Sequence, residues 1–216
     1  MMNCLDGVKG SLDVMMESLK AVEERRERLI KGTRDALMLC SKAIVCVHIN
    51  ELDTAWEKIS DASRIIGELR QVAGDDLQMH IVPAETELVE ARVLYSIVRE
   101  QSIPLADELR VSIRAYLLGL LDCIGELKRQ VYDRVREGKS SDALRLFEVM
   151  ESLYSMLLPF SAYDNVVQGV RRKVDVARML IEDVRAMLTE EMRRSAMLEA
   201  MKRIEARYGG GGSEST

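Results

Sequence analysis

The sequence has little of what other fold classes need. It carries three prolines among 216 residues, and its aromatic residues are one Trp, six Tyr and two Phe. Runs that alternate strictly between polar and β-branched or aromatic residues are rare, which argues against a sheet. Leu, Ala, Met, Arg and Glu are abundant, and straight-chain side chains lose little rotamer freedom in a helix. The composition therefore predicts an all-α protein.

Several other protein classes are excluded by what is missing. Only two histidines are present, and none of the four cysteines has C-x-x-C spacing, so a zinc site is not expected. The cysteines lie in apolar helical contexts, as reduced, packed thiols of a cytoplasmic protein do. No secretory signal and no apolar run of membrane-spanning length occurs, so no membrane partner is expected. The net charge of −5 excludes a uniformly basic nucleic-acid binder, and any nucleic-acid contact must come from a local cluster of Lys and Arg.

Hydrophobic periodicity and helix breakers predict six helices, at about 5–49, 50–72, 76 or 83 to 100, 104–137, 140–159 and 163–207. Asn50 is expected to cap the second helix, Pro83 to lie in the first turn of the third, and Pro104 to open the fourth. Short loops favour an antiparallel bundle of about six to seven helices, forming one domain over 1–208. The Gly/Ser-rich segment 209–216 is expected to be disordered. Several helices are long enough to leave a second apolar face uncovered, which predicts self-association.

Acidic pairs on apolar helices are the clearest chemical signal. Asp122 and Glu126 are four residues apart in a stretch that is apolar nearly all round, and the small residues Ala115 and Gly119 on the same face would leave room beside them. A second pair, Glu87 and Glu90, lies on the preceding helix. If a short turn at Pro104 folds the two helices back as neighbours, four carboxylates converge.

Such a cluster without histidine favours a hard cation, Mg²⁺ or also Mn²⁺, and suits phosphodiester hydrolysis. A di-iron bundle is disfavoured because it needs Glu-x-x-His pairs. The residues alone leave two alternatives open. The acids could be structural members of a non-catalytic oligomer that binds RNA or single-stranded nucleic acid, or solvated or Arg-paired positions of a helical scaffold.

Four segments resemble the translin family and, within it, the branch of translin-associated factor X (Trax). They are residues 26–48, with Arg26-Glu27-Arg28-Leu29-Ile30-Lys31-Gly32; the E-x-x-E-A segment 87–91; the Y-L-L-G-x-x-D-x-x-G-E-L segment 116–127; and the late helix 169–185. The match covers roughly residues 20 to 190 in consistent order. It departs from translin proper, whose basic, histidine-rich segment is absent at 83–87.

The resemblance implies a single-chain homologue of prokaryotic or archaeal type with an all-α translin-like subunit. It implies a homo-oligomer, an octameric shell by family likeness, in which a translin-like chain could co-assemble. It also implies RNA held inside and Mg²⁺-dependent endonucleolytic cleavage. By motif position, Glu87, Glu90, Asp122 and Glu126 would be the catalytic and metal-binding acids. Lys31, Arg34 and Arg129 would contact RNA phosphates.

Overall fold

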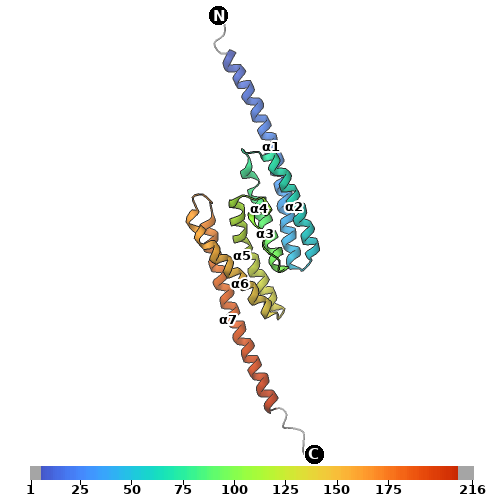
Figure 1. Cartoon of the computed structure of the whole chain (residues 1–216), viewed down its shortest axis with the longest axis vertical. Coiled ribbons are helices and arrows are strands. Elements are labelled where there is room, and N and C mark those ends of the chain that lie inside the picture. The colour runs from blue at the N-terminus through green and yellow to red at the C-terminus, as the bar shows by residue number, and fades with distance from the viewer. Residues whose placement is uncertain (1–5, 209–216) are drawn as a thin grey trace, which may run out of the picture. The chain divides into compact units, whose positions relative to one another are not determined.

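The computed structural model describes residues 6–208, and every regular element among them is a helix. The predicted all-α fold is confirmed (Figure 1). The prediction of a disordered segment at 209–216 lies outside the described residues. The described chain forms two compact units: one consists of the residues up to Cys123 together with Tyr163–Val170, and the other of Ile124–Ala162 and the residues from Arg171 onward. A single domain over 1–208 stays a prediction.

The first unit is organised around the long helix α1 (Asp6–His48), which packs against α2 (Leu52–Ala73) and α3 (Val82–Val98). A one-turn 3₁₀ helix, η1 (Gln78–His80), joins α2 to α3. The side chains buried between these elements include Leu29, Leu69, Ala73, Leu77 and Ile81. The first half of α1 extends beyond the end of α2, and Figure 1 shows it in dark blue without a neighbouring helix of this unit.

Helix boundaries differ from the predictions where backbone conformation decides them. Asn50 has φ of 62° and ends α1 in the left-handed region, which Asn tolerates, so it is not the cap of α2; Glu51 takes that position. Pro83 lies in the first turn of α3 as predicted. The predicted helix 104–137 is wrong at its start: it divides into α4 (Ala106–Leu109) and α5 (Ile113–Arg136), because Arg110 adopts φ of 53° between them.

The second unit contains the rest of α5 and all of α6 (Ser140–Leu157). It also contains the 3₁₀ segment η2 (Leu158–Tyr163) up to Ala162, and α7 (Val170–Tyr208) from Arg171 onward. Gly138, with φ of 73°, separates α5 from α6 as its sequence predicts. The polar side chains of this unit also join its helices: Lys128 Nζ lies 2.7 Å from Asp183 Oδ2, and Arg185 lies 2.6 Å from Glu151. None of the described helices combines the length and apolar character that crossing a bilayer requires.

Candidate metal and nucleic-acid site on α3 and α5

Glu87 and Glu90 lie on the side of α3 that faces α1. The Ser41 hydroxyl of α1 donates a hydrogen bond to Glu87 Oε1 at 2.8 Å. Burial, followed by the negative charges of Glu87 and Glu90, raises the pKa of the neighbouring Cys40 thiol to about 12. Glu90 is itself buried, with 8% of its surface exposed. The structure thus places both acids beside α1, with Glu90 buried and Glu87 half-buried.

Helices α3 and α5 approach each other closely at Gly119. A Cβ atom built there would lie 2.5 Å from the Thr86 carbonyl oxygen and 2.6 Å from Val89 Cβ. The sequence-based interpretation that Gly119 leaves open space beside Asp122 is therefore wrong, because the backbone of α3 fills that space. Because Gly119 has no side chain, α5, which carries Asp122, can pack directly against α3, which carries Glu87 and Glu90.

The connection between these helices also differs from the predicted short turn. Segment 99–112 leaves the end of α3 and returns to its beginning, where the buried Glu85 carboxylate accepts hydrogen bonds from the Ser112 amide at 3.2 Å and the Ser112 hydroxyl at 3.1 Å. Arg70 of α2 donates to the same carboxylate at 2.8 Å and to the Leu109 carbonyl at 3.3 Å. This buried ion pair places the first turn of α5 beside the first turn of α3.

Asp122 and Glu126 are half-buried and one turn apart on α5, with Glu126 at the start of the second unit. Over residues 6–208, the structure gathers no three His, Cys, Asp or Glu side chains in an arrangement that would hold a metal. The donor chemistry still fits Mg²⁺, which accepts carboxylate oxygens and usually keeps several waters, so that one or two carboxylates plus substrate phosphates suffice. The four-carboxylate site stays a prediction.

The three predicted RNA-contacting residues are all exposed. Lys31 and Arg34 lie three residues apart on α1, and Arg129 lies on the part of α5 that belongs to the second unit. Exposure leaves these cations in water, where they can exchange counterions for phosphates. Their assignment to RNA also stays a prediction.

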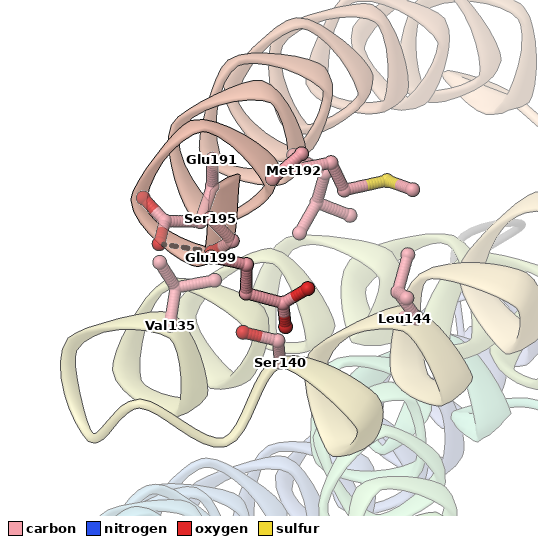
Figure 2. Close-up of a pocket in the computed structure, with 9 residues that line it drawn as sticks. Val135, Ser140, Leu144, Glu191, Met192, Ser195 and Glu199 are labelled. Atoms are coloured by element: carbon pink, nitrogen blue, oxygen red, sulfur yellow. Dashed lines mark hydrogen bonds between the residues drawn. The ribbon is translucent and has the colours of Figure 1, made fainter. Parts of the chain in front are cut away.

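A separate hollow of about 400 Å³ lies in the second unit between the end of α5, the first half of α6 and residues 188–199 of α7, as Figure 2 shows. Leu144 and Met192 line its apolar part, and the Ser195 hydroxyl donates to the Glu191 carboxylate at 3.4 Å. None of the predicted site residues lines it. The acids of the hollow have basic neighbours on α7: Glu191 lies 3.9 Å from Arg194, and Glu199 lies 3.4 Å from Arg203.

Part of the chain is similar to a known protein family. The model of the Translin family matches residues 84–190, the segment that holds α3, the Gly119 contact and α5. Over these residues the chain is similar to the translin family. The matched segment includes all four predicted acids, Glu87, Glu90, Asp122 and Glu126.

Solved structures share this fold over most of the chain. The chain superposes on the crystal structure of AfC3PO with a TM-score of 0.79 and 28% identity, covering 85% of this chain and 98% of that one. The structure of an AfC3PO–duplex RNA complex gives a TM-score of 0.78 at the same 28% identity, covering 85% of this chain and 97% of that one. Apo-NeC3PO, at 22% identity, 83% coverage of this chain and 96% of that one, has a TM-score of 0.74 and supports the fold alone.

A curated relative comes from Methanocaldococcus jannaschii. This protein, MJ0175, is described as uncharacterized and is 29% identical over 197 residues, which cover 90% of this chain and 88% of that protein. The similarities confirm the translin-like fold of seven α-helices and do not single out the Trax branch.

Two features of the candidate site were missed by sequence reasoning. The Arg70–Glu85 pair joins residues 15 apart on different helices, and the Ser41–Glu87 hydrogen bond joins residues 46 apart. No local spacing rule connects such positions. The available signal was Glu85, a third acid on a helix whose other residues are mostly apolar.

Proposed function

We propose that this protein is a Mg²⁺-dependent endoribonuclease of the translin family, of the Trax-like kind, working as a homo-oligomer. The observation that carries the proposal is its likeness to AfC3PO, a protein solved in complex with duplex RNA, over 97% of that chain. An octamer is the expected assembly, and a translin-like chain could join it. Mn²⁺ is expected to replace Mg²⁺, because both accept oxygen ligands.

The acids on α3 and α5 support the hydrolytic part of the proposal. Glu87, Glu90, Asp122 and Glu126 would hold the cation, which when bound lowers the pKa of a water and offsets charge on the phosphate. Ser41 restricts Glu87 by donating to Oε1 at 2.8 Å, so this carboxylate keeps one orientation. Gly119 keeps α5 against α3, which holds Asp122 close to the helix that bears the other pair.

The exposed cations support the RNA-binding part. Lys31 and Arg34 share one side of α1 and would neutralise successive phosphates, and Arg129 would add a contact from α5. Contacts to phosphate depend little on the base sequence of the RNA. We therefore expect binding to weaken as salt rises and to tolerate many RNA sequences.

One observation favours a second candidate, a non-catalytic RNA-binding oligomer. No three acidic, histidine or cysteine side chains within residues 6–208 form a metal-holding group. In this alternative the acids on α3 and α5 are structural. RNA would be bound without turnover.

A gel assay of labelled single-stranded and duplex RNA, with Mg²⁺ or with EDTA, tests both. Cleavage is expected with Mg²⁺ alone, and Asp122→Asn should abolish it while the binding midpoint stays within about twofold of the parent. Asp61→Asn, an exposed acid of α2, is the matched control and should cleave normally. Binding without cleavage by the parent would establish the alternative. If the parent cleaves and Asp122→Asn cuts equally fast, the assignment of the acids is wrong.

A further inference from the structure

The only tryptophan of the chain, Trp56, lies at the surface of the first unit on α2 and is 42% exposed. Two side chains of α3 support its ring. Arg92 Cζ lies 4.4 Å from the centre of the indole, and the Tyr95 ring centre lies 5.3 Å from it, with the two planes tilted by 34°. The indole is thus fixed from within the unit and still open to solvent.

Arg92 and Tyr95 lie on the same side of the indole. Arg92 Cζ is 5.7 Å from the Tyr95 ring centre, so the three centres form a nearly equilateral triangle with the distances of 4.4 and 5.3 Å to the indole. If the two side chains enclosed the indole from both sides, the distance between them would approach the sum of the other two. Arg92 and Tyr95 therefore leave the opposite face of Trp56 uncovered, which agrees with its exposure. We call this the open face.

The support beneath the indole is rigid. Arg92 Nη1 donates a hydrogen bond at 3.0 Å to the hydroxyl of Ser96, which is fully buried, and Tyr95 is only 7% exposed. Burial lowers the pKa of Arg92, although a guanidinium stays charged at neutral pH. A ring that is held in place before a ligand arrives loses little conformational entropy when it binds one.

The stacked guanidinium restricts what the open face can accept. A cation is attracted to the negative face of an aromatic ring, and Arg92 already provides one at Trp56. A second cation on the opposite face would be repelled by the first, whereas a neutral planar ring would not. Nucleobases are neutral planar rings that stack on aromatic side chains whatever their sequence. Within a duplex the bases stack on each other, so an unpaired base is the one that can reach such a site.

We propose that the open face of Trp56 is a stacking site for an unpaired base of an RNA strand. This inference rests on the proposed function, in which RNA is the ligand, and it adds a single-stranded end to the RNA that is bound. Arg99, exposed and one turn beyond Tyr95 on α3, would contact a neighbouring phosphate. Asp53 and Glu57 flank Trp56 on α2, so we expect the strand to leave the site toward Arg99.

Tryptophan fluorescence tests the site directly, because the emission comes from Trp56 alone. The full chain is titrated in EDTA, which prevents metal-dependent cleavage. A short single-stranded oligoadenylate should quench the emission, and a blunt RNA duplex of the same length should quench it much less. A peptide with one trimethyl-lysine should leave it unchanged. Equal quenching by the duplex, or stronger quenching by the peptide, would overturn the proposal.

Substitutions separate stacking from simple exposure. Trp56→Leu keeps an apolar side chain without a ring and should weaken the binding of labelled oligoadenylate, measured by fluorescence anisotropy, by about tenfold. Trp56→Phe should restore most of the affinity. Phe160→Leu is the matched control: Phe160 is 38% exposed on η2, and loss of its ring should change the affinity by less than about twofold. Far-UV circular dichroism checks that all three variants keep the parent's helix content.

The stacking site and the proposed function fail in different ways. If Trp56→Leu binds oligoadenylate as tightly as the parent, while both cleave RNA with Mg²⁺, the stacking site alone is overturned. If oligoadenylate quenches Trp56 but the parent cleaves no RNA, the stacking site is supported and the nuclease assignment is lost. A parent that binds no RNA would overturn both.

Discussion

Gly119→Ala is the substitution that most directly tests the contact between α3 and α5. The added Cβ would lie 2.5 Å from the Thr86 carbonyl oxygen and 2.6 Å from Val89 Cβ, roughly 1 Å inside ordinary van der Waals contact. Both neighbours belong to the body of α3 and cannot rotate away, so the helices must separate. Overpacking of this kind costs about 1–3 kcal/mol, while replacing a helical Gly by Ala returns about 1 kcal/mol. We therefore expect a net loss of up to about 2 kcal/mol.

Two other helical glycines provide matched controls for that value. A Cβ at Gly67 of α2 meets nothing within 4 Å, and one at Gly125 meets only Leu180 Cδ1 at 3.9 Å. Both Ala variants should gain about 0.5–1 kcal/mol from helix propensity alone. Urea unfolding of the three variants measures the differences. A Gly119→Ala protein as stable as Gly67→Ala would show that α3 and α5 do not meet at this residue, and the reasoning about the position of Asp122 would fail with it.

Two further predictions concern buried ionisable groups of the first unit. Glu85→Ala removes the carboxylate that pairs with Arg70, and it should lower the free energy of unfolding in urea by about 2–4 kcal/mol. Glu68→Ala removes an exposed ion pair and should lower it by less than about 0.5 kcal/mol. Equal losses would contradict the importance of the buried pair. Cys40, with its pKa raised from 9.0 to about 12, should carry roughly a thousandfold less thiolate at pH 8 than the unfolded chain. Its folded pKa exceeds its unfolded one, so the stability that it contributes is complete below pH 9 and is lost as pH rises toward 12. Iodoacetamide labelling followed by mass spectrometry checks Cys40, and labelling as fast as in denaturant would refute the assignment.

The helices could be predicted from the sequence because their causes are local. The 3.6-residue periodicity, Pro83 in a first turn and Gly138 at a helix end each act through a few neighbouring residues. The division of 104–137 into α4 and α5 was missed for the converse reason. Arg110 holds a left-handed conformation that its side chain does not favour, and the contacts of Glu85 with Ser112 that accompany it come from a distant segment.

The candidate site shows the same division between local and distant causes. Spacing alone identified Glu87 and Glu90 as a pair on one face, and in the structure both carboxylates lie near enough to Cys40 of α1 to raise its pKa. Spacing also suggested that Gly119 leaves an opening, and this was wrong because the partner surface, Thr86 and Val89, lies some 30 residues away in sequence. A missing side chain indicates a close approach, and the sequence does not say whether a ligand or a helix makes it.

The three acids of α3 show why burial alone does not identify a catalytic carboxylate. Glu85 is as buried as Glu90, yet its oxygens are fully engaged by Arg70 and Ser112, so it serves to fix the start of α5. Glu87 accepts a hydrogen bond from the neutral Ser41 hydroxyl of α1, and its negative charge helps to raise the pKa of Cys40. A carboxylate held by a guanidinium has its charge offset, whereas one held by a hydroxyl keeps a net charge that a cation can offset. Glu85→Ala should therefore act mainly by lowering the stability of the fold. Glu87→Gln should leave stability nearly unchanged while reducing any Mg²⁺-dependent activity.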